Sequence, residues 1–119
     1  MFFMQLFNYK DFDCYLALDS QDKLLFDFLY PILIRQGYIS DSNQQLLDSF
    51  NGCFTFKSER ALRDHLGILI KAGLIERELD KQFKNNHPIL IRYLYLNKYR
   101  FPEVAALKRP SNKFRAGDR

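Results

Sequence analysis

The sequence predicts an α+β fold, in which several helices are followed by a C-terminal β-hairpin, and three observations indicate it. The chain has 119 residues, enough for one domain with its own hydrophobic core. Of these residues 47% are hydrophobic, with 12 Phe and 7 Tyr, a composition that argues against overall disorder. Residues 58–75 have the pattern of a capped amphipathic helix, and residues 89–97 have the β-branched and aromatic content of a strand.

The first third of the chain predicts one long, buried helix. Residues 1–7 are strongly apolar and are expected to form a strand or a docked arm, whereas residues 9–18 fit a helix or a strand equally. Ser20 is expected to cap a helix that ends at Gly37, and Pro31 is expected to kink or divide it. This helix is apolar nearly all round, so it must be covered on more than one side, as a central core helix or a dimer interface would be.

A short strand over residues 38–40 and a second helix over residues 43–50 are expected next. Asp41 or Ser42 would cap the helix, and Asn51 with the following glycine would end it.

The third helix is the clearest element in the sequence. Ser58 is a good N-cap, Glu59 places a negative charge in the first turn, and Gly73 lies where a helix favours a left-handed residue. One apolar stripe should face the core, formed by Leu62, Leu66, Leu69 and Ile70. The residues that lie largely away from this stripe are Arg60, Arg63, Asp64, Gly67 and Lys71.

A hairpin is expected after this helix, with strands over residues 75–80 and 89–97 and a tip over residues 81–87. The pair Asn85-Asn86 can supply the positive φ angles that a tight reversal needs, and a proline precedes the second strand. Both faces of that strand are mostly apolar, so one should meet the helices and the other the N-terminal segment or a second subunit. A helix over residues 89–99 would also fit the pattern.

The stretch SERALRDHLGILIKAGLI, closing on KAGLIER and followed by two strands with a charged tip, resembles the recognition helix and wing of winged helix-turn-helix DNA-binding domains. Such domains occur in transcriptional regulators and in plasmid or phage replication proteins. The resemblance covers residues 42–97 and implies a small winged-helix domain whose third helix lies in or near the major groove. The connection over residues 53–57 is longer than the usual turn, and Phe54 and Phe56 within it are expected to pin the second helix to the core.

The net charge of +4 is unevenly distributed along the chain. Residues 1–50 carry three basic and seven acidic side chains, residues 51–99 nine and five, and residues 100–119 six and two. A basic surface confined to the third helix, the wing and the tail suits phosphate binding, although an ordinary solvated face with a basic tail has the same composition. The predicted nucleic-acid-binding residues are Lys57, Ser58, Arg60, Arg63, Asp64, Gly67, Arg77, Lys81, Lys84, Asn85, Lys108 and Arg109.

The expected organisation is a single domain over residues 1–107 and a flexible basic tail over residues 108–119. Pro102 is expected to open a short helix that ends before Pro110. The tail would track phosphates, enter a minor groove, or have no function.

Catalysis is the poorest interpretation of this chain. The histidines are His65 and His87, and neither has a serine or cysteine at a spacing that makes a nucleophilic pair. No glycine-rich phosphate loop or metal-ligand cluster is present in the sequence, so no catalytic residue, metal or cofactor is expected. The acids Glu76, Glu78 and Asp80 alternate along a strand, which indicates a solvated edge rather than a cation site.

The cysteines and the apolar runs indicate a cytoplasmic protein. Cys14 and Cys53 have no neighbouring metal ligands and are expected to be idle or buried thiols. The start of the chain makes a poor signal peptide, and residues 24–34 are too short an apolar run to span a bilayer.

The predicted function is sequence-specific or semi-specific binding of double-stranded DNA, as a transcriptional regulator or a replication-initiation accessory. A homodimer formed through the N-terminal apolar segments is expected, with a protein partner as a further possibility and no membrane association. Two alternatives stay open, a protein-interaction adaptor and a single-strand binder that stacks bases on exposed aromatic side chains.

Overall fold

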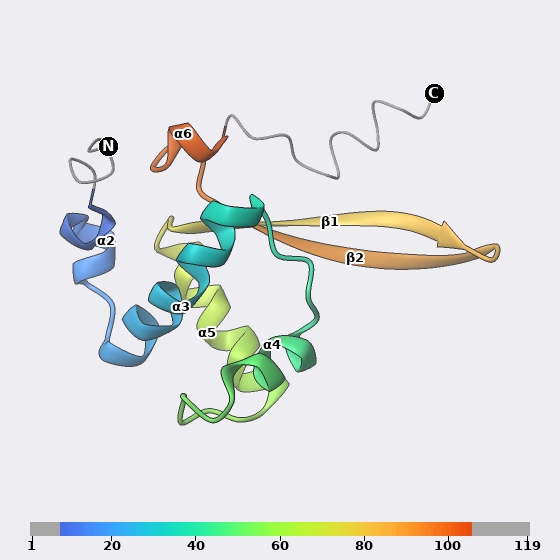
Figure 1. Ribbon diagram of the computed structural model, residues 1–119, viewed down its shortest axis with the longest axis horizontal. Coiled ribbons are helices and arrows are strands. Elements are labelled where there is room, and N and C mark those ends of the chain that lie inside the picture. Colours follow the sequence, from blue (N-terminus) through green and yellow to red (C-terminus); the bar gives the residue numbers. More distant parts are fainter. Residues whose placement is uncertain (1–7, 106–119) are drawn as a thin grey trace.

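Helices precede a C-terminal antiparallel hairpin in the computed structural model, which describes residues 8–105 (Figure 1). The elements are η1 (Tyr9–Asp11), α2 (Asp13–Leu16), α3 (Ser20–Gln36), α4 (Asn43–Phe50), α5 (Glu59–Lys71), β1 (Ile75–Lys84), β2 (His87–Leu96) and α6 (Pro102–Ala105). The predicted α+β fold class is confirmed, and the arrangement is compatible with a small winged-helix domain. The predicted N-terminal arm, the basic tail with Lys108 and Arg109, and the end of the helix expected after Pro102 lie outside the described residues.

Helix α3 runs without a break through Pro31, so the expected division of this helix was wrong. Pro31 lies on the exposed side, where water can bond the carbonyl group that loses its partner. The predicted N-cap was also wrong by one residue, because the side chain of Asp19, not Ser20, accepts a hydrogen bond from the backbone N–H of Asp22. The predicted end was right: Gly37 has a φ of 86° and donates its N–H to the carbonyl of Leu33.

The core is built around α3, which is covered on more than one side as the sequence predicts. Its fully buried side chains are Leu25, Phe26, Leu29 and Leu33. On one side, residues 9–18 form the two short helical segments η1 and α2, and the hydroxyl groups of Tyr9 and Tyr15 donate to Asp27 of α3 at 2.8 and 3.0 Å. Burial, followed by the hydrogen bond to Asp27, raises the pKa of Tyr15 to about 12. This segment is thereby fastened to α3 by hydrogen bonds that need protonated tyrosines.

Helix α4 begins with a capping box, in which Ser42 and Gln45 each accept a hydrogen bond from the other's backbone N–H. It ends at Asn51, which has a φ of 56°, as predicted. The expected strand over residues 38–40 is reduced to a single bridge between Ile39 and Leu94 of β2. In the connection to α5, Phe54 is buried against Phe50 with the ring centroids 4.6 Å apart, so this connection does pin α4 to the core.

The hairpin has a two-residue turn at Asn85-Asn86, with φ angles of 55° and 66°. The strands pair from Ile75 opposite Leu96 to Lys84 opposite His87. The predicted tip over residues 81–87 was therefore too long, because two successive asparagines with positive φ reverse the chain at once.

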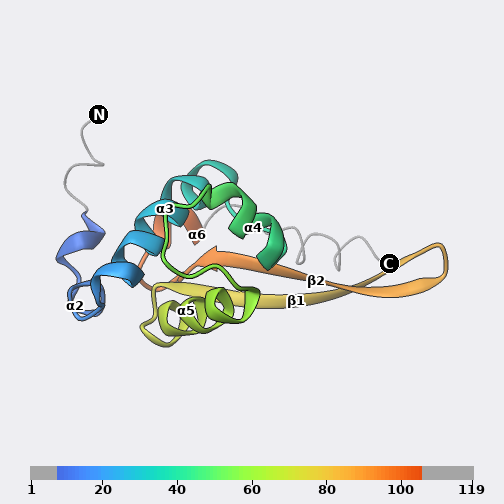
Figure 2. The same cartoon turned by 90° about the horizontal axis from the view of Figure 1, so that it is seen from below.

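Burial in the hairpin changes along its length more than between its faces. The inner part of β2 is buried on both faces, including Tyr93 on one and Leu94 on the other. In the outer part, Leu79, Phe83 and Leu90 are 55%, 70% and 68% exposed. The expectation that both faces are covered is right for the inner half only, because the hairpin extends well beyond the helices (Figures 1 and 2).

Candidate nucleic-acid interface

Helix α5 has local stop and start signals at both ends, as the sequence predicts. The hydroxyl oxygen of Ser58 accepts the backbone N–H of Ala61 at 3.0 Å. At the other end, Gly73 has a φ of 83° and donates to the carbonyl of Ile70, and Leu74 donates to the carbonyl of Leu69. These two bonds form a Schellman motif, which ends the helix and starts β1 two residues later.

The two faces of α5 separate as predicted. Leu62, Leu66 and Leu69 are buried in the core. The predicted outward residues are all exposed, namely Arg60, Arg63, Asp64, Gly67 and Lys71. Lys57 and Ser58, immediately before the helix, are exposed as well. The structure thus brings seven residues with predominantly basic character onto one end and one face of a single rigid element.

Gly67 is in the middle of the exposed face, and nothing within residues 8–105 requires a glycine there. A Cβ atom built at this position meets no atom within 4 Å, and the residue has an ordinary helical backbone. Glycine in a helix interior costs about 0.5–1 kcal/mol relative to alanine. The bare backbone at Gly67 therefore leaves a shallow place on the helix surface at some cost in stability.

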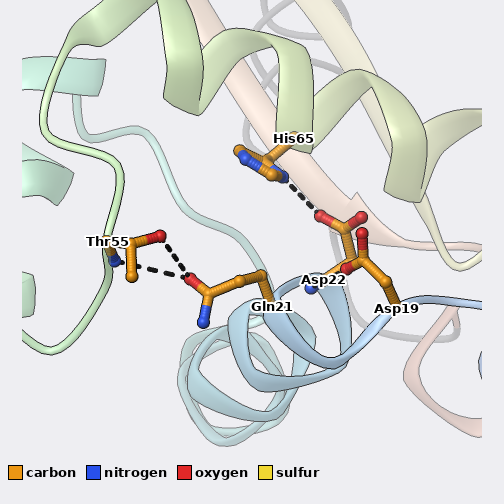
Figure 3. A network of polar contacts seen from close by, with 5 residues as sticks. All are labelled: Asp19, Gln21, Asp22, Thr55 and His65. Carbon is orange, nitrogen blue, oxygen red and sulfur yellow. Dashed lines mark hydrogen bonds and ion pairs between the residues drawn. The ribbon is translucent and has the colours of Figure 1, made fainter.

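His65 joins α5 to α3 through a polar contact (Figure 3). Its Nδ1 atom lies 2.6 Å from Oδ1 of Asp22, which is 2% exposed, and its ring stacks on Phe56. Burial raises the pKa of Asp22, and the hydrogen bond and charge of His65 oppose that rise. His65 thus contacts the first turn of α3 and helps to position α5.

A second contact in Figure 3 fastens the connection before α5. The side-chain oxygen of Gln21 accepts hydrogen bonds from the hydroxyl and the backbone N–H of Thr55, at 3.2 and 3.4 Å. Together with the pair of Asp22 and His65, this contact holds the start of α5 against α3. Sequence reasoning missed both contacts, because they join residues 34 and 43 positions apart.

Arg92 is a further residue that sequence reasoning missed. Its Nη2 atom donates to the carbonyl of Asp41 at 2.7 Å, and its Nη1 atom donates to the side chain of Asn43. Burial, and then the nearby charge of Arg77, lowers the pKa of Arg92. The guanidinium group therefore clamps β2 to the start of α4, and a charged residue inside the run ILIRYLYL was the available signal.

The predicted residues of the hairpin are exposed but do not share one face. Arg77 and Lys81 lie on the face that also holds Leu79, whereas Lys84 lies on the opposite face, and Asn85 is in the turn. The hairpin tip also lies far from α5 along the long axis of the molecule (Figure 1). The predicted site residues therefore form two separate groups, one on α5 and one on the hairpin.

The prediction that Glu76, Glu78 and Asp80 form a solvated edge was wrong for Asp80. This residue is only 8% exposed and accepts a hydrogen bond from the side chain of Gln82 at 3.2 Å. Glu76 accepts the backbone N–H of Lys98, so it too serves the fold. Within residues 8–105, no group of three or more histidine, cysteine or acidic side chains is arranged to hold a metal ion.

The fold and the exposed face of α5 define a small α+β protein with a basic helix surface and a projecting hairpin. In the described part of the chain, no helix has the length and apolar character needed to cross a membrane. Comparison with known proteins finds no family model, curated protein or solved structure that matches this chain.

Proposed function

We propose that this protein binds double-stranded DNA through the exposed face of α5, as a transcriptional regulator or a replication-initiation accessory. The observation that carries the proposal is the surface around Gly67. Arg60, Arg63, Asp64 and Lys71 share the exposed face with this position, where no contact within residues 8–105 accounts for a glycine. A groove wall or a phosphate that approaches the helix closely would explain both the charge and the missing side chain.

The basic side chains of this surface are available to an external anion. Among residues 8–105, His65 and Asp22 lie at ion-pair distance, and neither Arg60 nor Arg63 has a carboxylate partner within that range. Asp64, on the same face, would repel phosphates and so favours contacts of the helix with base edges over contacts with the DNA backbone.

The proposed roles follow from side-chain chemistry. Arg60 and Arg63 would contact guanine edges or phosphates, because a guanidinium group can donate two parallel hydrogen bonds to either. Lys57 and Ser58 would contact phosphate at the start of the helix. Lys81, Lys84 and Asn85 of the hairpin would reach the flanking backbone.

Fluorescence anisotropy with labelled duplex and single-stranded oligonucleotides, at several salt concentrations, tests the proposal. We expect a preference for duplex, with log affinity falling against log salt at a slope of roughly −4 to −6 for the basic residues named. If neither form binds at low salt, the proposed function is wrong.

Arg63→Ala should lower duplex affinity by about 1–3 kcal/mol in binding free energy while leaving the thermal midpoint unchanged, because the side chain is exposed. Arg35→Ala is the matched control, since it removes the same charge from an exposed position in the last turn of α3. Equal losses for the two variants would mean that net charge alone drives binding and would remove Arg63 from the interface.

A protein-interaction function is the second candidate, favoured by the exposed apolar side chains of the outer hairpin. A single-strand binder is favoured by Tyr99, which is 82% exposed beside Lys98. The single-stranded arm of the anisotropy experiment separates this last function from duplex binding.

A further inference from the structure

The outer edge of β1 is an unpaired strand edge. The two-residue turn makes Lys84 and His87 a hydrogen-bonded pair. From this pair toward the core, every second residue of each strand forms backbone hydrogen bonds with the other strand of the hairpin. The residues between them direct their backbone N–H and C=O groups away from the hairpin. Leu94 supports this assignment, because it belongs to the outward class and exchanges both backbone hydrogen bonds with Ile39, at 3.0 and 2.9 Å.

The outward class on β1 consists of Ile75, which is buried, and four exposed residues, Arg77, Leu79, Lys81 and Phe83. For these four residues no outward backbone hydrogen bond is found within the range the structure describes. The edge of β2 is protected in two places, by Ile39 at Leu94 and by Pro88, whose missing N–H falls on the outward side. The open edge of this sheet is therefore that of β1.

The same edge carries large apolar side chains. Leu79 and Phe83 lie on one face, with Leu90 across the hairpin on that face, and all three are more than half exposed. A two-stranded ribbon without helices over it is marginally stable. Addition of further strands would satisfy the backbone groups and bury part of these side chains.

We propose that β1 pairs with β1 of a second copy of this chain, antiparallel and centred on Lys81, to form a four-stranded sheet across a two-fold axis. The proposal concerns the hairpin edge and does not depend on the proposed DNA binding. It gives a route to a homodimer other than the N-terminal apolar segments, which stay a prediction.

Complementarity of the strand with itself selects both the partner and the register. With Lys81 opposite its own copy, Leu79 lies opposite Phe83 of the second copy, and Glu78 lies opposite Lys84 of the second copy. Two-fold symmetry makes each pair occur twice. Each cross-strand pair of this kind contributes about 0.2–1 kcal/mol.

Neighbouring registers are worse for charge or for apolar pairing. Centring on Gln82 pairs Asp80 with Lys84, but it places Leu79 opposite Asn85 of the turn and Phe83 opposite Lys81, so the apolar pairs are lost. Centring on Asp80 places two buried carboxyl groups opposite each other. Centring on Leu79 places Lys81 opposite Arg77 and Asp80 opposite Glu78, which are like-charge pairs. The register centred on Lys81 leaves one like pair, that of Lys81 with itself, at exposed positions where long side chains can separate.

Disulfide cross-linking tests the register directly. In a Cys14→Ser, Cys53→Ser background, Lys81→Cys should give a covalent dimer on mild oxidation, since facing residues in a hydrogen-bonded pair have Cα atoms about 5.5 Å apart. Leu79→Cys and Phe83→Cys should not cross-link alone but should do so when the two proteins are mixed. If Lys81→Cys stays monomeric, or if Leu79→Cys alone cross-links efficiently, the register is overturned.

Analytical ultracentrifugation with a charge swap tests the partner. Lys84→Glu should weaken the dimer at least tenfold, and adding Glu78→Lys should restore it, whereas Lys10→Glu, which makes the same charge change in η1, should have no effect. Circular dichroism verifies that each variant is folded. A monomeric wild type at high micromolar concentration, or no rescue by the double variant, would overturn the proposal, and neither result depends on DNA.

Discussion

The notable residues of this protein fall into two groups: those whose identity is explained by a contact within the described structure, and those whose identity is not. Arg92 and His65 are polar residues with internal partners, and they hold the hairpin and α5 in place. Gly67 has no such explanation, because its backbone is helical and a side chain would meet open space. The residues without an internal reason are those from which an external partner can be inferred.

Gly67→Ala should raise the free energy of unfolding by about 0.5–1 kcal/mol, because alanine has the better helix propensity and a Cβ meets nothing there. Gly52→Ala is the contrasting control: its site is equally open, but its φ of 79° makes the same change destabilising by about 1–2 kcal/mol. Urea unfolding measures both.

In DNA binding, Gly67→Gln should lose more affinity than Gly67→Ala while remaining folded, since a longer side chain keeps the helix farther from the groove. Full affinity in the folded Gln variant would show that nothing approaches this surface closely.

At the scale of elements, α5 is placed by a few specific contacts with α3 in addition to its apolar stripe. The pair of Asp22 and His65 connects the two helices in a partly buried place, where the charge of the carboxyl group matters. The orientation of α5 therefore depends on a titratable contact that its own sequence does not reveal.

This contact predicts a pH dependence of stability. Because burial raises the pKa of Asp22 above the usual 3.8, the folded state holds more protons than the unfolded state between 3.8 and the folded pKa. Stability contributed by Asp22 should therefore be greatest below pH 3.8 and fall as the pH rises through the folded pKa. Urea unfolding of the wild type and of Asp22→Asn should be measured from pH 3 to 7. The free energy of unfolding of the wild type should fall relative to that of the variant as the pH rises through this range. A wild-type advantage that grows with pH would mean that the ionised pair with His65 dominates.

At the scale of the whole molecule, the core and the hairpin tip are separate. The buried residues of the hairpin, such as Ile75, Leu94 and Leu96, lie in its inner half, against the helices. The outer half contributes exposed basic and apolar side chains to the surface, so the fold should not depend on it.

A shortened hairpin tests this separation. Deleting residues 81–84 and 87–90 joins Asp80 and Ile91 through Asn85-Asn86. The turn keeps its geometry, because Asp80 and Ile91 form a hydrogen-bonded pair, as Lys84 and His87 do in the wild type. The variant should unfold cooperatively with a midpoint within a few degrees of the wild-type monomer and should stay monomeric. An unfolded product would show that the outer hairpin supports the core.

Elements whose signals are local could be predicted from the amino-acid sequence. Caps and left-handed residues marked α4 and α5, the apolar stripe of α5 faced the core as predicted, and two asparagines marked the hairpin turn, because each of these signals acts within a few residues. Boundaries that depend on competing local choices, such as Asp19 against Ser20 and the extent of the hairpin tip, were less accurate.

Which surfaces remain exposed could be learned only from the packing of the elements against one another. The pairing of Asp22 with His65, the clamp made by Arg92 and the burial of Asp80 join residues far apart in sequence or depend on how far the helices extend along the hairpin. A strand that is apolar on both faces is expected to be buried on both faces. How far along the strand this burial extends depends on how the helices pack against it. The exposed outer half of the hairpin is the consequence, since the helices cover only its inner half.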